Sequence, residues 1–184
     1  LQEEEWAATR RIHASLAQTL EHSLARGIDA YELSLQGVVQ GLADPVVMGL
    51  PAAVRHRALF DESLRMSGGA GILVLDVHGD VVLGSGQLEP RHANLADRDY
   101  FQHFAQGRHT GPYIGPPVLS RLTGKYLLPL AHARYQADGR FAGVVVGGLR
   151  LEYFNSLFSA MELGAQSGIT LFLADGTVVT SFPY

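Results

Sequence analysis

The chain has 184 residues, 47% of them hydrophobic, which is enough to bury the core of a globular domain. Its net charge of -4 and the scattered placement of its 14 Lys and Arg residues, of which Lys125 is the only lysine, argue against a nucleic-acid-binding protein. The absence of cysteine excludes disulfides, thiolate zinc sites and cysteine nucleophiles, and leaves the cellular compartment open.

A long amphipathic helix is expected first, over residues 1–43. Apolar side chains recur along it at helical spacing, at Ile12, Leu16, Leu20, Leu24, Ile28, Tyr31, Leu35, Val38 and Leu42. At about 1.5 Å per residue this helix exceeds roughly 50 Å, more than a domain of this size needs for its own core. Part of it is therefore expected to stand free or to pair with a partner; the alternative is a helix buried along the whole domain. Asp44-Pro45 is expected to end it.

Residues 44–162 have the pattern of a PAS-like module. The expected elements, in order, are a helix from Pro51 to the Gly68-Gly69 turn, strands at 71–77 and 81–85, a short helix at 98–106, a loop at 113–117, and strands at 118–122, 125–135 and 141–149. Five antiparallel strands with helices inserted after the second predict an α+β fold.

Local signals define parts of this module more closely. Asp97 is expected to be the N-cap of the short helix, and Gly107 suits the position just past its last turn. Pro129 cannot donate a ladder hydrogen bond, so it implies a sheet edge or a bulge. The strand at 141–149 is rich in glycine, which indicates a place where another group approaches the backbone.

The end of the chain repeats the beginning of the module. A helix is expected at 151–161, and the hairpin pattern of 168–180 resembles that of 72–83. Because a lone hairpin is only marginally stable in water, residues 163–184 are interpreted as a linker and the first hairpin of a second PAS-like module.

No membrane span or signal peptide is visible in the given sequence. Its longest uncharged apolar run near the sheet, 141–149, has about half the length of a membrane span. The chain begins within a helical pattern and without an initiator Met, so we expect flanking segments outside the given sequence.

Arg98 is the leading candidate for a binding residue. A cation in the first turn of a helix opposes the helix dipole by roughly 0.3–1 kcal/mol, so an arginine there indicates a nearby anion. The anion is either a bound ligand, which a guanidinium can hold through two hydrogen bonds, or the adjacent Asp97 or Asp99.

Six further residues are candidates for ligand contact. Tyr100, Phe101 and Tyr113 can form pocket walls, although aromatic residues at helical spacing also serve as plain core. Ser120, Arg121 and Lys125 flank a predicted turn and can reach a ligand, although turn residues are commonly solvated.

Enzyme and cofactor chemistry is not indicated. The eight histidines have no zinc-like spacing, and no metal site is expected. Ser120 lacks the nucleophile elbow of a serine hydrolase. The glycines at 143–148 lie within a strand rather than before a helix, so no dinucleotide fingerprint and no cofactor are expected.

Four segments taken in order resemble a known family. Asp97-Arg98-Asp99-Tyr100-Phe101, Gly115-Pro116-Pro117, the run from Ser120 to Lys125 and the run from Asp138 to Val146 are similar to the Cache (PDC) sensor domains. The resemblance is strongest to the periplasmic double-Cache regions of bacterial diguanylate cyclases and related histidine kinases.

This resemblance implies the periplasmic or extracellular sensing part of an inner-membrane protein, tethered by segments outside the sequence and without enzymatic activity of its own. Residues 44–162 are then the membrane-distal module, and the first helix rises from the membrane, pairs in a homodimer and carries the signal. Arg98, Tyr100 and Phe101 match the family's pocket pattern, and Tyr113 matches a tyrosine that often joins it.

One departure bears on the ligand. Family members that bind amino acids carry an acidic residue near the end of the last strand, where this sequence has Gly147-Gly148-Leu149. The expected ligand is therefore a carboxylate or another small anion. The alternative function is a ligand-free structural or dimerisation module of a membrane protein.

Overall fold

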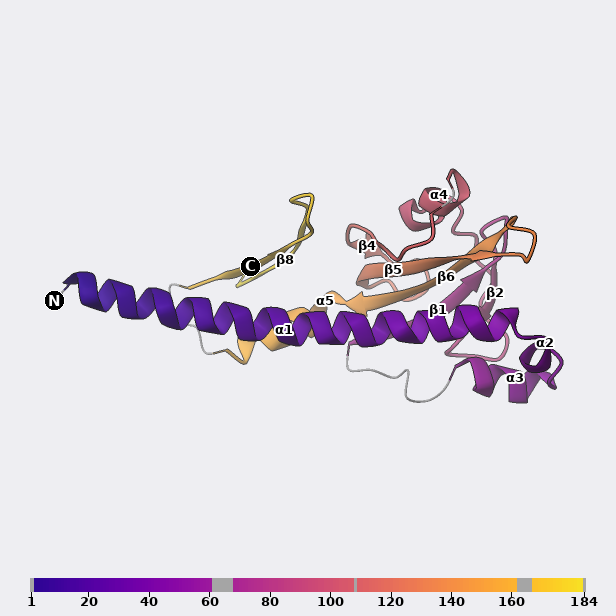
Figure 1. The fold of residues 1–184 in the computed structure, drawn as a ribbon, viewed down its shortest axis with the longest axis horizontal. Helices are drawn as coiled ribbons and strands as arrows, with labels where there is room; N and C mark the ends of the chain where they lie inside the picture. Colours follow the sequence, from indigo (N-terminus) through magenta and orange to yellow (C-terminus); the bar gives the residue numbers. More distant parts are fainter. Residues whose placement is uncertain (1, 61–67, 108, 162–166, 184) are drawn as a thin grey trace.

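A computed structural model describes residues 2–60, 68–107, 109–161 and 167–183. Within these residues the chain forms a six-stranded antiparallel sheet, a separate two-stranded sheet and five helices. Figure 1 shows the long first helix running beside both sheets, with its N-terminus at one end of the molecule. The α+β, PAS-like fold expected from the sequence is confirmed.

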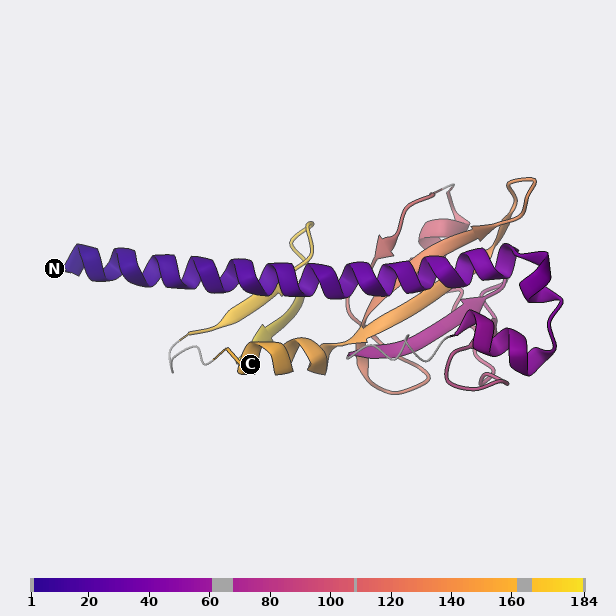
Figure 2. The ribbon, with the colours of Figure 1, turned by 60° about the horizontal axis from the view of Figure 1, so that its bottom comes forward.

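Helix α1, Gln2–Ala43, has the length that its apolar spacing predicts. Its C-terminal half packs on the larger sheet through buried side chains at Tyr31, Leu35, Val38 and Leu42. Its N-terminal half extends past that sheet and lies beside the smaller one (Figures 1 and 2). The helix is therefore neither free nor buried along its whole length.

Two short helices follow α1. Asp44 ends α1 and caps α2, Pro45–Met48, because its Oδ1 accepts a hydrogen bond of 2.8 Å from the amide of Val46. Helix α3, Ala52–Leu59, begins after Pro51 as predicted. The expected continuation of this helix to residue 66 lies outside the described residues.

The larger sheet has the strand order β2-β1-β6-β5-β3, with β4 also paired to β5. Its strands are β1 (Gly69–Leu75), β2 (Val81–Gly84), β3 (Tyr113–Ile114), β4 (Val118–Leu119), β5 (Tyr126–Tyr135) and β6 (Phe141–Arg150). The segment expected to be a loop at 113–117 instead starts with β3, which pairs Tyr113 with Ala131 and Ile114 with Leu130. Two residues are too few to show an alternating pattern, so the sequence did not reveal this strand.

Pro129 lies in the interior of the sheet, so the edge or bulge expected there is wrong. Strand β5 pairs with β6 on one side and with β3 and β4 on the other. Leu130 pairs with β3 and Leu127 with β4, which puts Pro129 at the gap between these short strands. Its carbonyl accepts a hydrogen bond of 3.1 Å from Gly115. The missing N–H of proline therefore falls where no ladder bond is required.

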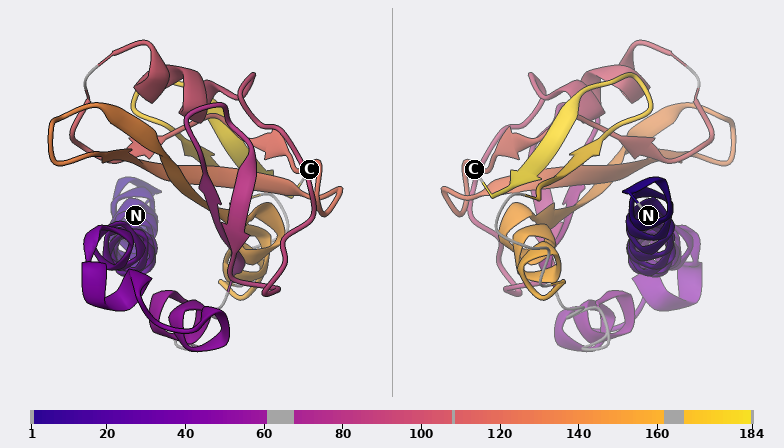
Figure 3. Two further views of the ribbon diagram at one scale, coloured as in Figure 1. Left: turned by 90° about the vertical axis from the view of Figure 1, so that its right-hand side faces the viewer. Right: turned by 90° about the vertical axis from the view of Figure 1, so that its left-hand side faces the viewer.

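Each face of the larger sheet has its own core. Helices α1, α3 and α5 (Leu151–Ser159) cover one face, around Ile72, Val74 and Val145. Helix α4, Asp99–Ala105, covers the other face, around Leu75, Val144 and neighbouring aromatic side chains. Figure 3 shows α4 and α1 on opposite sides of the sheet. On this face α4 contacts β6, β5 and β3.

The smaller sheet is the hairpin of β7, Ile169–Phe172, and β8, Val178–Phe182, which confirms the predicted C-terminal hairpin. It packs against α5, where Thr180 Oγ1 donates a hydrogen bond of 3.0 Å to Asn155 Oδ1. A search of the described residues finds no helix with the length and apolarity needed to cross a membrane.

Candidate functional site

The start of α4 differs from its prediction. Asp97 does not cap the helix; the N-cap position is Arg98, and no side chain caps the first turn. Instead, both carboxylate oxygens of Asp97 accept hydrogen bonds from the Arg121 guanidinium, at 2.7 and 2.5 Å. The hydrogen bond from Arg121 holds the pKa of the Asp97 carboxyl below its usual value. The pair is exposed, so it orients the 120–124 turn over α4 more than it stabilises the fold.

Arg98 is left without a carboxylate partner. Its Nη2 donates a hydrogen bond of 2.9 Å to the carbonyl of Leu119, and among the described residues it forms no salt bridge. Its Nε is buried and has no hydrogen-bond partner. A buried donor without an acceptor costs roughly 1–3 kcal/mol, and more when the group is charged. The ion pair of Arg98 with Asp97 or Asp99 that the sequence allowed is therefore not formed.

Two adjoining pockets surround Arg98. The inner pocket, of about 90 Å³, lies between the 120–123 turn and the sheet. The outer pocket, of about 380 Å³, opens between the start of α4 and the segment 115–119. Both are lined by Arg98, Tyr100, Val118 and Pro129. Arg98 and Tyr100 therefore line both pockets, which are together called the recess, with the outer pocket as its mouth.

The two pockets differ in chemistry. The inner pocket contains the side chains of Arg98 and Arg121, has no acidic residue in its lining, and is floored by the backbone of Gly71, Gly147 and Gly148. The outer pocket includes Asp97 and Asp99. Because Arg121 is paired with Asp97, Arg98 is the one arginine in the lining of the inner pocket that has no carboxylate partner among the described residues.

Tyr100 supplies a hydroxyl to this recess. Burial raises the pKa of Tyr100 to about 12, against the opposing effect of the Arg98 charge. The hydroxyl therefore stays protonated at neutral pH and is available as a hydrogen-bond donor.

Tyr113 lines only the outer pocket. The His103 ring stacks on it with a centroid separation of 4.4 Å, and His109 stacks on the far side of His103 at 4.1 Å. These contacts fix the orientation of the Tyr113 ring at the mouth of the recess.

The other predicted site residues are spread more widely. Ser120 and Arg121 line the inner pocket, and Ser120 Oγ accepts hydrogen bonds from the amides of Leu122 and Thr123. Phe101 lies in the core with 4% of its surface exposed, edge-on to Phe141, and lines neither pocket. Lys125 also lines neither pocket and reaches Glu152 at 3.5 Å.

Sequence reasoning missed the glycine floor as a part of the site. The signal was the run of glycines at the end of β6, which indicated a close approach to the backbone without identifying the approaching group. Gly71 gave no signal of this kind, because it comes next to Gly147 and Gly148 only through the pairing of β1 with β6. Nowhere in the described parts of the chain do three or more His, Asp or Glu residues gather closely enough to hold a metal ion.

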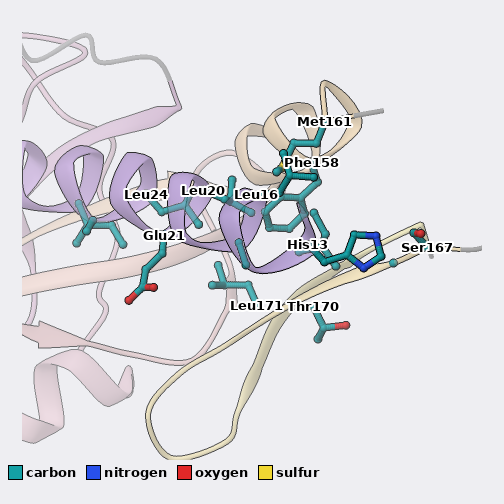
Figure 4. Close-up of a pocket in the computed structure, with 15 residues that line it drawn as sticks. His13, Leu16, Leu20, Glu21, Leu24, Phe158, Met161, Ser167, Thr170 and Leu171 are labelled. Carbon is teal, nitrogen blue, oxygen red and sulfur yellow. The ribbon is translucent and has the colours of Figure 1, made fainter. Parts of the chain in front are cut away.

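A hollow larger than either of these pockets lies elsewhere. It is a groove of about 820 Å³ between the N-terminal half of α1, the end of α5 and the β7–β8 hairpin. Figure 4 shows Leu16, Leu20 and Leu24 of α1 facing Phe158 and Leu171, with His13 at one end. The groove is open and mainly apolar, and its lining contains no Lys or Arg. It therefore offers no guanidinium or ammonium group to an anion, unlike the pockets at Arg98.

Comparison with known proteins gives structural neighbours only. No family model and no curated protein matches the chain. Among solved structures, the extracellular domain of a protein classed as a histidine kinase, rpHK1S-Z16, has a TM-score of 0.77 at 24% identity, over 92% of this chain and 68% of that chain. An extracellular ligand-binding receptor from Desulfohalobium retbaense has a TM-score of 0.71 at 15% identity, over 90% and 30% of the two chains.

A third neighbour is the ligand-binding domain of the Pseudomonas fluorescens chemoreceptor CtaA, in complex with L-isoleucine. Its TM-score is 0.65 at 17% identity, over 89% of this chain and 64% of that chain. The present chain thus spans between about a third and two thirds of the length of these neighbours. At these identities the likeness concerns the fold. The chain has the fold of the extracellular ligand-binding domains of histidine kinases and chemoreceptors, as its sequence motifs predicted.

Proposed function

We propose that this chain is the extracytoplasmic sensing domain of a transmembrane bacterial signalling protein, and that it binds a small ligand through a carboxylate or similar anionic group at Arg98. The observation that carries the proposal is that Arg98 lines both pockets and, among the described residues, has no carboxylate partner. A ligand carboxylate in these pockets supplies that anionic partner, and a charge-assisted hydrogen bond of this kind is strong where water is excluded.

The form of the recess supports a small ligand. The inner pocket has room for a carboxylate and a few carbon atoms beside Arg98, and the Tyr100 hydroxyl is a second donor. Wider ligand groups fit toward the outer pocket, which has Tyr113 in its wall. The binding energy then comes from one desolvated ion pair and from apolar contact with the sheet.

Whether the ligand carries an amine is a separate question. CtaA is known in complex with L-isoleucine, and the Pseudomonas aeruginosa chemoreceptor PctC in complex with GABA. In the present chain the inner pocket has no acidic side chain to hold an ammonium group beside the carboxylate. We therefore expect the anionic group to dominate recognition. If the ligand has an ammonium group far from its carboxylate, the acidic side chains that can contact it are Asp97 and Asp99, which line the outer pocket.

The wider setting is part of the same proposal. Segments outside this sequence anchor the domain in the inner membrane, and α1 carries the signal and pairs in a homodimer. A histidine kinase or a diguanylate cyclase is the output domain. Residues 44–162 form the membrane-distal module, and the hairpin at 168–180 begins a second one. The fold neighbours support the sensing role in this setting, because they include an extracellular domain of a protein classed as a histidine kinase and a ligand-binding domain of a chemoreceptor.

The test is ligand-induced thermal stabilisation. Wild-type protein is screened with two matched pairs that differ only in the amine, GABA with butyrate and L-isoleucine with 3-methylpentanoate. A ligand present at about 100 times its Kd stabilises the folded state by roughly 2.7 kcal/mol. We expect a carboxylate to stabilise the wild type, with little dependence on the amine.

Two variants locate the effect. Arg98→Ala is expected to abolish the stabilisation, and Arg140→Ala, which removes an exposed arginine paired with Asp138 in a distant turn, is expected to retain it. Equal stabilisation of Arg98→Ala and wild type by the same compound would refute the assignment of Arg98. If no member of a broader panel of anions stabilises the wild type, the ligand-free structural module is the better interpretation.

A further inference from the structure

Strands β1 and β6 are joined through a bulge. Gly69 pairs with Leu149 and Ile72 pairs with Gly147, so Ala70 and Gly71 on β1 oppose Gly148 alone on β6. Gly71 has a φ of +96°, a conformation that a side chain would make costly. A bulge of this kind takes the backbone groups of its extra residue out of the regular ladder.

The side chain of Tyr31, from α1, forms hydrogen bonds with the backbone at this bulge. Its side chain is fully buried, and its hydroxyl donates a hydrogen bond of 2.8 Å to the carbonyl of Gly71 and accepts one of 3.1 Å from the amide of Gly148. One phenol therefore satisfies a carbonyl on β1 and an amide on β6. Burial raises the pKa of Tyr31 to about 12, so the hydroxyl keeps its proton at neutral pH and both hydrogen bonds persist.

The same backbone forms the floor of the inner pocket. Gly71, Gly147 and Gly148 line that pocket on the α4 face of the sheet, while Tyr31 reaches them from the α1 face. The contact is close, because a Cβ added to Gly147 would lie 2.5 Å from the Tyr31 hydroxyl oxygen. A single layer of backbone therefore separates the recess beside Arg98 from the longest helix of the molecule.

We propose that Tyr31 is a positioning residue for the ligand site: its hydroxyl holds the bulge in the shape that floors the inner pocket, and it links ligand occupancy to the placement of α1. This inference rests on the proposed function, since it concerns the same recess. The Tyr31 hydrogen bonds connect the bulge to α1. A ligand that favours one arrangement of the bulge therefore also favours the position of α1 in which these hydrogen bonds form. Such coupling is reciprocal, so a change at Tyr31 alters ligand affinity.

The test compares Tyr31→Phe with a matched control. Phenylalanine keeps the ring and removes both hydrogen bonds. Thr180→Val removes another buried hydroxyl, which bonds Asn155 in the distant hairpin. Protein labelled with [15N]glycine reports the amide exchange of Gly148, and titration calorimetry gives the Kd of butyrate, GABA and L-isoleucine.

The first readout needs no ligand. In Tyr31→Phe the Gly148 amide loses its acceptor, and we expect it to exchange about tenfold faster than in wild type, with no change in Thr180→Val. Unchanged exchange of Gly148 in Tyr31→Phe would overturn the positioning role whether or not any probe binds.

The second readout concerns affinity. For a probe that binds the wild type, we expect the Kd in Tyr31→Phe to rise by about tenfold, while Thr180→Val keeps the wild-type value. A Kd unchanged in Tyr31→Phe overturns the inference and leaves the proposed function intact. If none of the three probes shifts a glycine signal of the wild type, binding of these three carboxylates by the recess is contradicted instead, and Gly148 exchange still decides the role of Tyr31.

Discussion

The one buried histidine of the described residues lies where α1 meets the sheet. His132 of β5 is 7% exposed, and its Nε2 is 3.6 Å from Oε1 of Glu32 on α1, without a hydrogen-bond partner. Gln36 donates a hydrogen bond of 3.1 Å to the same Glu32 oxygen. Burial lowers the pKa of His132, and the nearby Glu32 carboxylate only partly offsets this effect. His132 is therefore neutral at pH 7 in the folded protein.

This burial predicts a loss of stability in mild acid. Because the pKa of His132 is lower in the folded state than in the unfolded state, where it is about 6.5, the unfolded chain binds the proton first as the pH falls. Proton uptake by His132 in the unfolded chain therefore destabilises the folded state. This destabilisation is absent above about pH 7.5 and grows as the pH falls below about 6.5. Urea denaturation at pH 7.5 and 5.0 is expected to show a smaller acid-induced loss for His132→Gln than for wild type. His78→Gln, at an exposed turn, should follow the wild type; equal losses in all three proteins would contradict the prediction.

At the scale of elements, α1 has one face that belongs to the core. Leu35 is fully buried against the sheet, whereas Leu33 on the same helix is 67% exposed. Both are leucines in the same helix with the same intrinsic helix propensity, so their difference measures tertiary packing alone.

The two leucines make a matched pair for mutation. Leu35→Ala is expected to lower the free energy of unfolding by about 2–5 kcal/mol, because it removes buried methyl groups and leaves a cavity. Leu33→Ala is expected to change it by less than about 0.5 kcal/mol. The measurement is chemical denaturation followed by circular dichroism. Similar effects of the two changes would mean that α1 does not pack on the sheet as described.

At the scale of the whole molecule, α1 lies along both sheets. Its 42 residues span about 60 Å, so one helix passes the larger sheet and then the β7–β8 hairpin. The groove of about 820 Å³ in Figure 4 lies along this second stretch, with Leu16, Leu20 and Leu171 in its lining. An open apolar groove of this size leaves surface that binds apolar molecules.

This surface predicts binding of a hydrophobic dye by the folded protein. We expect 8-anilinonaphthalene-1-sulfonate to fluoresce more strongly in the presence of the protein, and Leu16→Gln to reduce that fluorescence because Leu16 lines the groove. Ile12→Gln is the control, since Ile12 is 60% exposed on the same helix and does not line the groove. A dye signal that is absent, or is lowered equally by both changes, would contradict the prediction that the groove binds the dye.

The sequence predicted the elements whose signals are local. The apolar spacing of α1, the Asp44-Pro45 stop and the three turns that close β1–β2, β5–β6 and β7–β8 are properties of neighbouring residues, and all of them are confirmed. The short strand β3 and the interior position of Pro129 were missed, because they depend on which strands lie alongside and leave no periodic trace.

Some residues of the candidate site were likewise predicted correctly from the sequence, and others were not. Arg98 was identifiable because an arginine in the first turn of a helix is unusual, and Tyr100 because it matches the pocket pattern of the family that the sequence resembles; both line the recess. Phe101 and Lys125 stand in the same sequence motifs but face the core and Glu152. Sequence neighbours on a short helix point in different directions, and the sequence alone does not state which direction the sheet occupies.

The sequence by itself determined the long first helix, the α+β class and the sensor-like order of motifs, since periodicity, turns and motifs are carried by adjacent residues. Only the tertiary structure decided three features of the site. Arg121 pairs with Asp97, the buried Nε of Arg98 has no hydrogen-bond partner among the described residues, and the Tyr31 hydroxyl accepts a hydrogen bond from the Gly148 amide. These pairs are 24 and 117 residues apart in the chain. Contacts over such separations arise from strand pairing and helix packing, which bring together residues whose local sequences carry no record of one another.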